Sequence, residues 1–239
     1  MHLMQRTRLI GANWKMNPPP PRFDAPDSPY RSSASARVIV FPSLLDIPLC
    51  KGSGIESGAQ CARPEDAGAF TGDVSVKQIK NAGCSAVLCG HSERRHMHGE
   101  SDALIALQVK AGLENGLTTI LCIGETAKER DALSTNACLE RQLQSVLSLG
   151  ERNLTTEHFV IAYEPVWAIG TGMTPTPDDV VKTHAFIRSL LPSDDIRILY
   201  GGSVTGANAG SFLSAPGVDG ALVGGASLKP SEFEKIVRA

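Results

Sequence analysis

Several side chains that could move a proton at a carbon beside a carbonyl group stand at the ends of apolar, strand-like runs of this sequence. Glu164 could act as the general base, His91 could polarise the carbonyl oxygen, and Lys15 could offset the charge of a developing enediolate. Asn13 lies two residues before Lys15, so an extended strand would place both on one face. Gln60 lies near the end of a further run. The combination favours proton-transfer chemistry at one site.

Each of these residues also has an ordinary structural explanation. A lysine at a strand end is usually a solvated tip, His91 could be a core histidine with satisfied hydrogen bonds, and Glu164 could be a helix-capping carboxylate. The catalytic interpretation gains weight because all three residues stand at strand ends of one predicted sheet.

Two glycine pairs follow the last two strand-like runs. Gly201 and Gly202 precede Ser203 after the seventh run, and Gly224 and Gly225 follow the eighth. Glycines expose backbone N–H groups without a side chain in the way, which suits phosphate binding at barrel strand ends. One pair alone would be weak evidence, because tight turns often use it. Two pairs in these positions favour a phosphate site.

Short apolar runs recur at intervals of about 30 residues, the size of a βα unit. The eight runs are residues 8–15, 36–42, 56–61, 86–91, 118–125, 159–166, 196–202 and 220–225. Several lack polar alternation, which is typical of parallel strands buried on both faces.

Helices are predicted most clearly over 102–114, 135–149 and 177–191. Gly116 would end the first, and Thr176 would cap the third ahead of a proline at its first position. Eight βα units predict an α/β protein whose residues 1–239 form a single-domain (β/α)8 barrel, a TIM barrel. An open, doubly wound sheet is the alternative, but no G-x-G-x-x-G motif follows the first strand.

One segment breaks the pattern. Residues 18–21 are four consecutive prolines, and Pro26 and Pro29 follow. Proline lacks an N–H and its ring clashes with the preceding helical turn. The first helix is therefore predicted to be shortened, missing or replaced by a polyproline-like loop. A flexible interdomain linker is a weaker explanation, because the first strand could not form a domain alone.

Composition excludes several classes of function. Lys and Arg total 23 against 25 Asp and Glu, which argues against a nucleic-acid binder. No apolar run approaches the roughly 18 residues of a membrane span, and no secretory h-region follows Met1. The six cysteines form no C-x-x-C pair and suit small buried hydrophobes in a reducing cytoplasm better than disulfides or metal ligands.

Six segments resemble, in order, motifs of the triosephosphate isomerase family. They are residues 11–17 (GANWKMN), 68–72 (GAFTG), 89–95 (CGHSERR), 162–172 (AYEPVWAIGTG), 200–204 (YGGSV) and 222–228 (LVGGASL). The likeness runs from about residue 8 to the end of the sequence, apart from the proline segment.

The resemblance implies interconversion of dihydroxyacetone phosphate and D-glyceraldehyde 3-phosphate through an enediolate, in glycolysis and gluconeogenesis, without a cofactor or a metal. It implies that Glu164 takes and returns the proton and that His91 is a neutral electrophile. Asn13 and Lys15 would hold the substrate. Glu93 would be a second carboxylate near Lys15 that takes part in catalysis.

Phosphate binding and lid closure are implied by the same resemblance. The N–H groups of Gly170, Ser203 and Gly225 would hold the phosphate, with Gly224 beside them. Residues 165–172 resemble a lid that closes over the substrate and excludes water.

A second subunit is also implied. The loop 68–72 resembles one that reaches into a partner chain, where Thr71 would approach the partner's Asn13 and the partner's Glu93. A cytoplasmic homodimer is therefore expected.

Two neighbours of the implied site bear on these roles. A helix starting near Ser92 would direct its N–H dipoles at His91, and Cys122 matches a family cysteine beside the site.

The rear of the lid departs from the resemblance. The family usually has a non-proline residue where this chain has Pro175, and its N–H would bond Tyr200 on closure. Proline has no N–H, so this hydrogen bond is predicted to be absent. The stretch from Lys15 to His91 is also several residues shorter than in the family, which agrees with a truncated first helix.

Two other functions remain open on the sequence. One is a non-catalytic phosphate-binding barrel with an interaction role. The other is a different phosphate-binding barrel isomerase or lyase, as on the histidine or tryptophan pathways, although such enzymes need another acid–base pair. Turnover of a triose phosphate would separate the isomerase from both alternatives.

Overall fold

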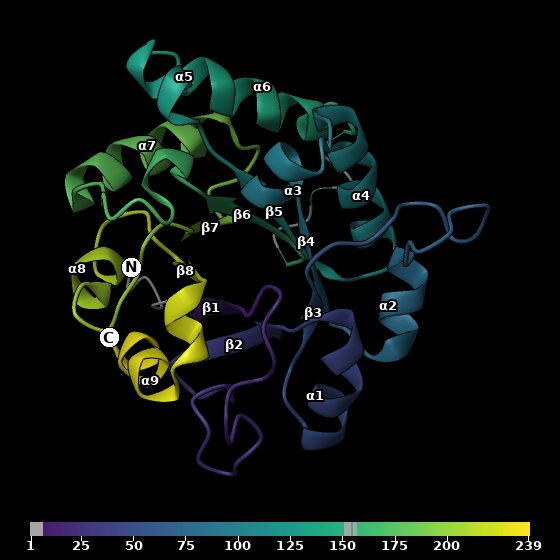
Figure 1. The fold of residues 1–239 in the computed structure, drawn as a ribbon. Helices are drawn as coiled ribbons and strands as arrows, with labels where there is room; N and C mark the ends of the chain where they lie inside the picture. Colours follow the sequence, from purple (N-terminus) through teal and green to yellow (C-terminus); the bar gives the residue numbers. More distant parts are fainter. Residues whose placement is uncertain (1–6, 151–153, 155–156) are drawn as a thin grey trace.

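The computed structural model describes residues 7–150, 154 and 157–239, and within them eight parallel strands surround a central axis (Figure 1). The strands are β1 (Arg8–Asn13), β2 (Ala36–Phe41), β3 (Gly58–Ala59), β4 (Ala86–Cys89), β5 (Thr118–Ile123), β6 (Phe159–Tyr163), β7 (Arg197–Tyr200) and β8 (Gly220–Val223). All eight predicted strands are confirmed, although each ends one to three residues earlier than the apolar run predicts.

Strand pairing excludes the open-sheet alternative. β1 pairs with both β2 and β8, and the remaining strands follow in sequence order around the sheet. The ring closes between β2 and β3, where Val40 and Ser57 form a parallel bridge and the Val40 N–H donates to the Glu56 carbonyl at 3.0 Å. The architecture is the predicted (β/α)8 barrel.

Both faces of the strands are buried. On β6, Val160 and Ala162 belong to the cluster that fills the barrel, whereas Phe159, Ile161 and Tyr163 pack in the layer between strands and helices. This two-sided burial explains why the strand sequences show no polar alternation.

Helices surround the barrel in the described part of the chain (Figure 1). They are α1 (Ile47–Ser53), α2 (Val76–Ala82), α3 (Ser92–Met97), α4 (Asp102–Glu114), α5 (Ala127–Asp131), α6 (Thr135–Leu147), α7 (Pro177–Leu190), α8 (Ala209–Leu213) and α9 (Pro230–Arg238), with short 3-10 helices η1 (Leu44–Asp46), η3 (Val166–Ala168) and η4 (Gly225–Leu228).

Local signals place the three clearest helices well. α4 has the predicted bounds, while α6 and α7 end two and one residues early. Gly116 follows α4 with φ 70°, and Thr176 forms a capping box with Asp179 at the start of α7. The described chain has no helix that could span a membrane.

The connection from β1 to β2 is the predicted exception. All of residues 14–35 are described, and they form turns and bends without a helix. The prediction of a shortened or missing first helix is confirmed, because proline lacks the N–H and the space that a helix interior requires.

Candidate active site

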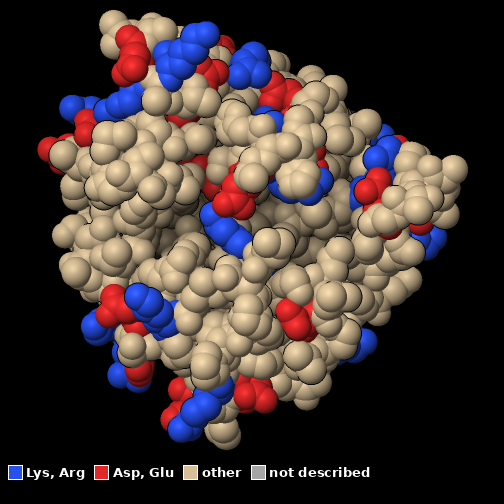
Figure 2. Space-filling model, in the orientation of Figure 1, with Lys and Arg blue, Asp and Glu red and all other residues tan. Residues whose placement is uncertain are grey.

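A cavity of about 330 Å³ opens at the carboxyl ends of the strands. Four of its side chains are the predicted Asn13, Lys15, His91 and Glu164. The loops after β6, β7 and β8 supply the rest of its polar wall, which includes Gly170, Gly201, Gly202, Ser203, Gly224 and Gly225. Figure 2 shows this face hollowed at its centre, where basic and acidic atoms meet. The structure thus brings the predicted groups together.

Lys15 reaches the cavity in a way that strand alternation did not predict. It lies beyond β1 with φ 53°, in the left-handed region, so the argument that it shares a strand face with Asn13 is wrong. The Gln60 amide holds this turn by donating to the carbonyls of Lys15 at 2.7 Å and Phe41 at 2.9 Å. The Lys15 N–H also donates to the Asn13 side chain at 3.1 Å.

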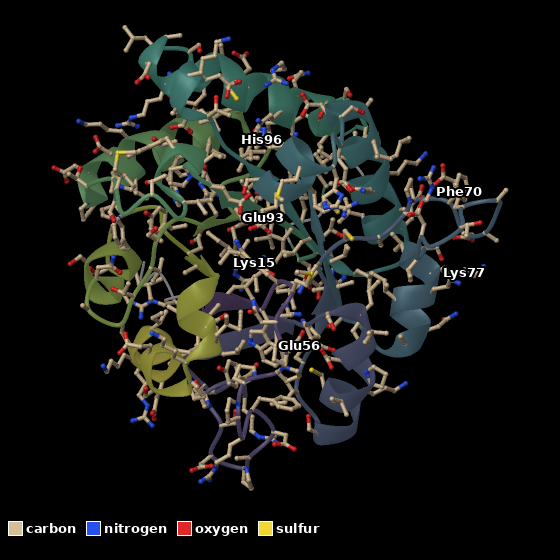
Figure 3. All side chains as sticks on the ribbon, viewed as in Figure 1. Lys15, Glu56, Phe70, Lys77, Glu93 and His96 are labelled. Atoms are coloured by element: carbon tan, nitrogen blue, oxygen red, sulfur yellow. The ribbon has the colours of Figure 1, made fainter. Side chains whose placement is uncertain are left out.

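Glu93 stands beside the cavity and pairs with Lys15. The Lys15 ammonium lies 2.6 Å from its carboxylate, and Figure 3 shows the two side chains facing one another over the barrel. Their side chains are 29% and 45% exposed, so solvent screens the pair and its net stabilisation is small. The contact instead fixes where the ammonium points.

His91 and Glu164 are in direct contact. His91 Nε2 lies 3.0 Å from Glu164 Oε1, and the other carboxylate oxygen accepts the Ser92 N–H at 2.8 Å. His91 Nδ1 accepts the Glu93 N–H at 3.2 Å, at the start of α3. A ring whose Nδ1 is an acceptor carries its proton on Nε2 and is neutral. The predicted helix starting near Ser92 is confirmed, with His91 as its N-cap residue.

Burial and charge set the ionisation of this pair. Burial raises the pKa of Glu164. His91, the Ser92 N–H and Lys15 together lower it by more, so the pKa lies below the ordinary value. Burial lowers the pKa of His91, while the Glu164 carboxylate outweighs it and raises the pKa above the ordinary value. Glu164 is therefore a carboxylate at neutral pH, the form that a base requires.

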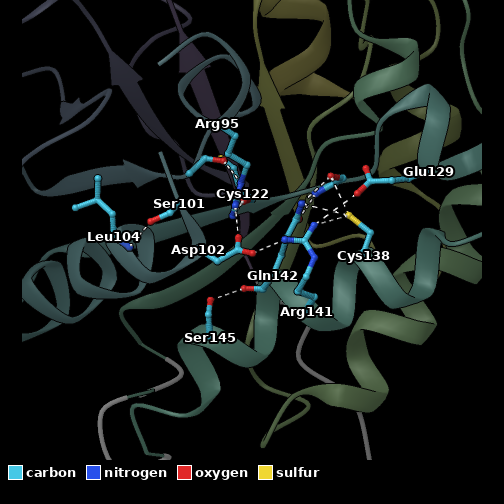
Figure 4. Close-up of polar contacts among 12 residues, drawn as sticks. Arg95, Ser101, Asp102, Leu104, Cys122, Glu129, Cys138, Arg141, Gln142 and Ser145 are labelled. Atoms are coloured by element: carbon cyan, nitrogen blue, oxygen red, sulfur yellow. Dashed lines mark hydrogen bonds and ion pairs between the residues drawn. The ribbon is translucent and has the colours of Figure 1, made fainter. Parts of the chain in front are cut away.

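Arg95 connects the ends of two strands below these residues (Figure 4). Arg95 donates to the carbonyls of Gly90 at 2.8 Å and Cys122 at 3.1 Å, and Asp102 pairs with its guanidinium. These bonds tie the ends of β4 and β5 to α3. Arg95 is the last residue of the CGHSERR segment, but nothing in that segment indicates that it bonds the ends of two strands.

Gln142 on α6 hydrogen-bonds the backbone of Gly124, which lies against Glu164. Its amide oxygen accepts the Gly124 N–H at 2.8 Å, and its amide nitrogen donates to the Gly124 carbonyl at 3.1 Å. A Cβ at Gly124 would lie only 1.7 Å from the Glu164 carbonyl oxygen, so no larger residue fits there. No local pattern in the sequence indicates this role of Gln142, because its partner is a glycine 18 residues earlier.

The predicted lid begins with η3. Trp167 donates to the buried Glu125 carboxylate at 2.9 Å, and the Tyr163 hydroxyl contacts the same carboxylate. At the rear, Pro175 is buried and the buried Tyr200 hydroxyl has no hydrogen-bond partner among the described residues. The predicted absence of a Pro175 hydrogen bond follows from its chemistry, and its effect on closure stays a prediction.

The loop 68–72 projects away from the barrel, with Phe70 at its outer end (Figure 3). Thr71 is exposed there. Cys122 is buried inside the barrel, below the site, and its carbonyl is one of those that Arg95 holds.

Comparison with known proteins gives one consistent family. The family model described as triosephosphate isomerase matches residues 8–239. Curated relatives named triosephosphate isomerase include those of Xanthobacter autotrophicus, 45% identical over 98% of this chain and 97% of the relative, and Lawsonia intracellularis, 45% identical over 97% of each. The relative from Aquifex aeolicus is 42% identical over 96% of this chain and 98% of its own. The chain therefore belongs to the triosephosphate isomerase family.

Proposed function

We propose that this protein is an aldose–ketose isomerase that interconverts dihydroxyacetone phosphate and D-glyceraldehyde 3-phosphate through an enediolate, in glycolysis and gluconeogenesis. The observation that carries the proposal is the meeting of Glu164, His91 and Lys15 in one cavity whose far wall is glycine-rich backbone. The names of the curated relatives support the same reaction. No observation favours a non-catalytic barrel.

Glu164 removes the proton. Its carboxylate is buried and ionised, and it bonds His91 and the Ser92 N–H. A small rotation of the side chain would break these bonds and bring a carboxylate oxygen to the substrate carbon. The same oxygen returns the proton to the neighbouring carbon, which completes the isomerisation without a cofactor or a metal.

His91 transfers its Nε2 proton to the carbonyl oxygen as it becomes a hydroxyl and recovers a proton from the neighbouring hydroxyl as it becomes the carbonyl, so the ring is neutral before and after the reaction. Once the carboxylate turns to the substrate carbon, burial and Lys15 both favour the neutral ring, and the Glu93 N–H still occupies Nδ1. Lys15 stabilises the enediolate charge and Asn13 positions the substrate. Glu93 takes part by directing the Lys15 ammonium.

The phosphate binds to the N–H groups of Gly170, Ser203 and Gly225, with Gly224 at the edge. A Cβ at Gly170 or Gly225 would meet nothing within 4 Å, so both positions face open space with room for a ligand. Closure of residues 165–172 then excludes water, which protects the enediolate from losing phosphate.

Residues 1–239 form one domain in this proposal, and two copies form a cytoplasmic homodimer through the loop that contains Thr71. Exposed apolar side chains support a second copy as the partner: Met16 is 96% exposed, Leu45 89% and Met97 77%. A monomeric mass by sedimentation at assay concentrations would overturn the dimer.

Replacement of Glu164 by Asp tests the base. The change retracts the carboxylate by one methylene, and a misplacement of about 1 Å can cost about 10²-fold in rate. We expect kcat for D-glyceraldehyde 3-phosphate, in a coupled assay, to fall by about that factor with a smaller change in KM. Glu140→Asp, at an exposed position on α6, is the matched control and should keep the wild-type rate.

A wild-type enzyme with no turnover that still bound a phosphate-bearing enediolate mimic would favour the non-catalytic barrel instead. Equal kcat values for wild type and Glu164→Asp would leave the proposed reaction in place but show that Glu164 is not its base.

A further inference from the structure

The helix-free connection between β1 and β2 places one buried tyrosine against two arms of the site. Tyr30 is 0% exposed, and it lies in the segment that follows the four consecutive prolines. Its hydroxyl contacts the loop after β8 and its ring contacts Trp14 after β1, and both of these segments continue into the cavity described above.

The hydroxyl supports the loop after β8. Tyr30 donates to the Ser227 carbonyl at 2.6 Å, and Ser227 is fully buried at the end of η4. The Ser227 N–H and hydroxyl both bond back to the Gly224 carbonyl, at 2.8 Å and 2.7 Å. The tyrosine is thus linked, through one residue, to the glycine pair that lines the cavity.

The ring contacts the end of β1 and the C-terminal helix. It stacks on Phe233 of α9 with ring centres 4.9 Å apart, and it meets Trp14 edge-on at 5.4 Å. Trp14 is the residue between Asn13 and Lys15. One side chain therefore touches the elements that carry both the lysine and the glycine pair.

The segment itself is well held without a helix. The Arg31 guanidinium donates to the carbonyls of Ala25 at 2.9 Å and Ser53 at 3.0 Å, which ties the segment to the end of α1. The Ser28 hydroxyl accepts the Tyr30 N–H at 3.2 Å and donates to the Phe23 carbonyl. These bonds fix the backbone from which Tyr30 extends.

We infer that Tyr30 is a positioning residue that sets the phosphate-binding glycines 224 and 225 through the Ser227 carbonyl, an inference that rests on the proposed function. Hydrogen bonds to a phosphate are directional, so a small shift of η4 would misalign the N–H groups. Removal of the hydroxyl leaves the buried Ser227 carbonyl without its donor, and a shift of η4 is the simplest way to relieve that cost.

Tyr30→Phe tests the inference, because it keeps the ring contacts and removes only the hydroxyl. We expect kcat/KM for D-glyceraldehyde 3-phosphate to fall by about 3- to 30-fold, less than a misplaced reacting group would cost. The inhibition constant for inorganic phosphate should rise by a similar factor. Turnover of D-glyceraldehyde, which has no phosphate, should change by less than about twofold.

Ser32→Ala is the matched control. Ser28 itself bonds the Tyr30 N–H and so cannot be the control. The Ser32 hydroxyl bonds only the Val38 backbone in the same connection, and it bonds neither Tyr30 nor Ser227. Its removal should lower the melting temperature and leave phosphate inhibition unchanged. Equal losses on both substrates, or an unchanged phosphate inhibition constant in Tyr30→Phe, would overturn the inference. Calorimetric titration with inorganic phosphate gives the same comparison without turnover, so a failed isomerase assay would reject the proposed reaction and not the role of Tyr30.

Discussion

Lys15 keeps a left-handed backbone that costs an ordinary residue about 1 kcal/mol or more, so something must offset that cost. Its carbonyl is bonded to Gln60, its N–H to Asn13, and its ammonium to Glu93. Every polar group of the residue is therefore directed by a neighbour. The geometry of this lysine depends on three other residues, which lie at the end of β1, just after β3 and in α3.

Gln60→Met should displace Lys15 by removing both amide hydrogen bonds while keeping the size of the side chain. We expect kcat/KM for the triose phosphate to fall by about 10-fold or more, because a shift of the lysine weakens the stabilisation of the enediolate. Steady-state kinetics measure the loss. Gln144→Met, at an exposed position on α6, is the control, and wild-type kinetics in Gln60→Met would count against this role.

Residue-scale detail was the least predictable part of the site. The residue types and strand ends predicted which groups meet, because parallel strands end at the same edge. The left-handed Lys15 could not be predicted, because it depends on Gln60, 45 positions away. The Tyr30–Ser227 bond spans 197 positions and carries no local signal.

At the scale of elements, prediction succeeded wherever the cause is local. The capping box at Thr176 and the glycine after α4 fixed helix ends, and the prolines removed a helix. The strands are shorter than their apolar runs, and in five of the eight runs the last residues leave the ladder to line the cavity. His91 and Glu164 both lie just beyond a strand for that reason.

The lid gives the prediction at this scale. Pro175→Ala supplies a backbone N–H at the position that, by the family resemblance, would bond the Tyr200 hydroxyl when the lid closes. That hydroxyl is buried and has no hydrogen-bond partner among the described residues. One hydrogen bond of about 1 kcal/mol would favour the closed lid and lower the ratio of phosphate elimination to isomerisation by about fivefold. Product analysis in buffer measures this ratio.

The double variant Pro175→Ala with Tyr200→Phe should cancel the gain, since the acceptor is then absent. An unchanged ratio in Pro175→Ala alone would mean that the fixed φ of proline already organises the hinge.

At the scale of the whole molecule, a buried histidine makes stability depend on pH. His184 on α7 is 1% exposed and its Nδ1 bonds the Gly217 carbonyl at 2.9 Å. Burial lowers its pKa to about 4, whereas an unfolded chain would protonate it near its ordinary pKa of 6.5. The unfolded state therefore binds an extra proton between these values, and stability falls as the pH drops through that window.

Urea unfolding at about pH 7 and about pH 4.5 measures this loss, which should approach about 3 kcal/mol for His184 across the full window. His184→Asn can keep the hydrogen bond to Gly217 and cannot titrate. Contributions from His91 and Glu164 are common to both proteins. If the two proteins lost stability equally on acidification, His184 would not be the cause.

The closure of the barrel has one further consequence. β2 and β3 meet through a single bridge at Val40, and the same gap is spanned near its upper end by Gln60, whose amide reaches the Phe41 carbonyl. That amide is also the group that holds the Lys15 turn. A thermal opening of the barrel between β2 and β3 would therefore also free Lys15. Closure of the barrel and the position of the catalytic lysine depend on the same side chain.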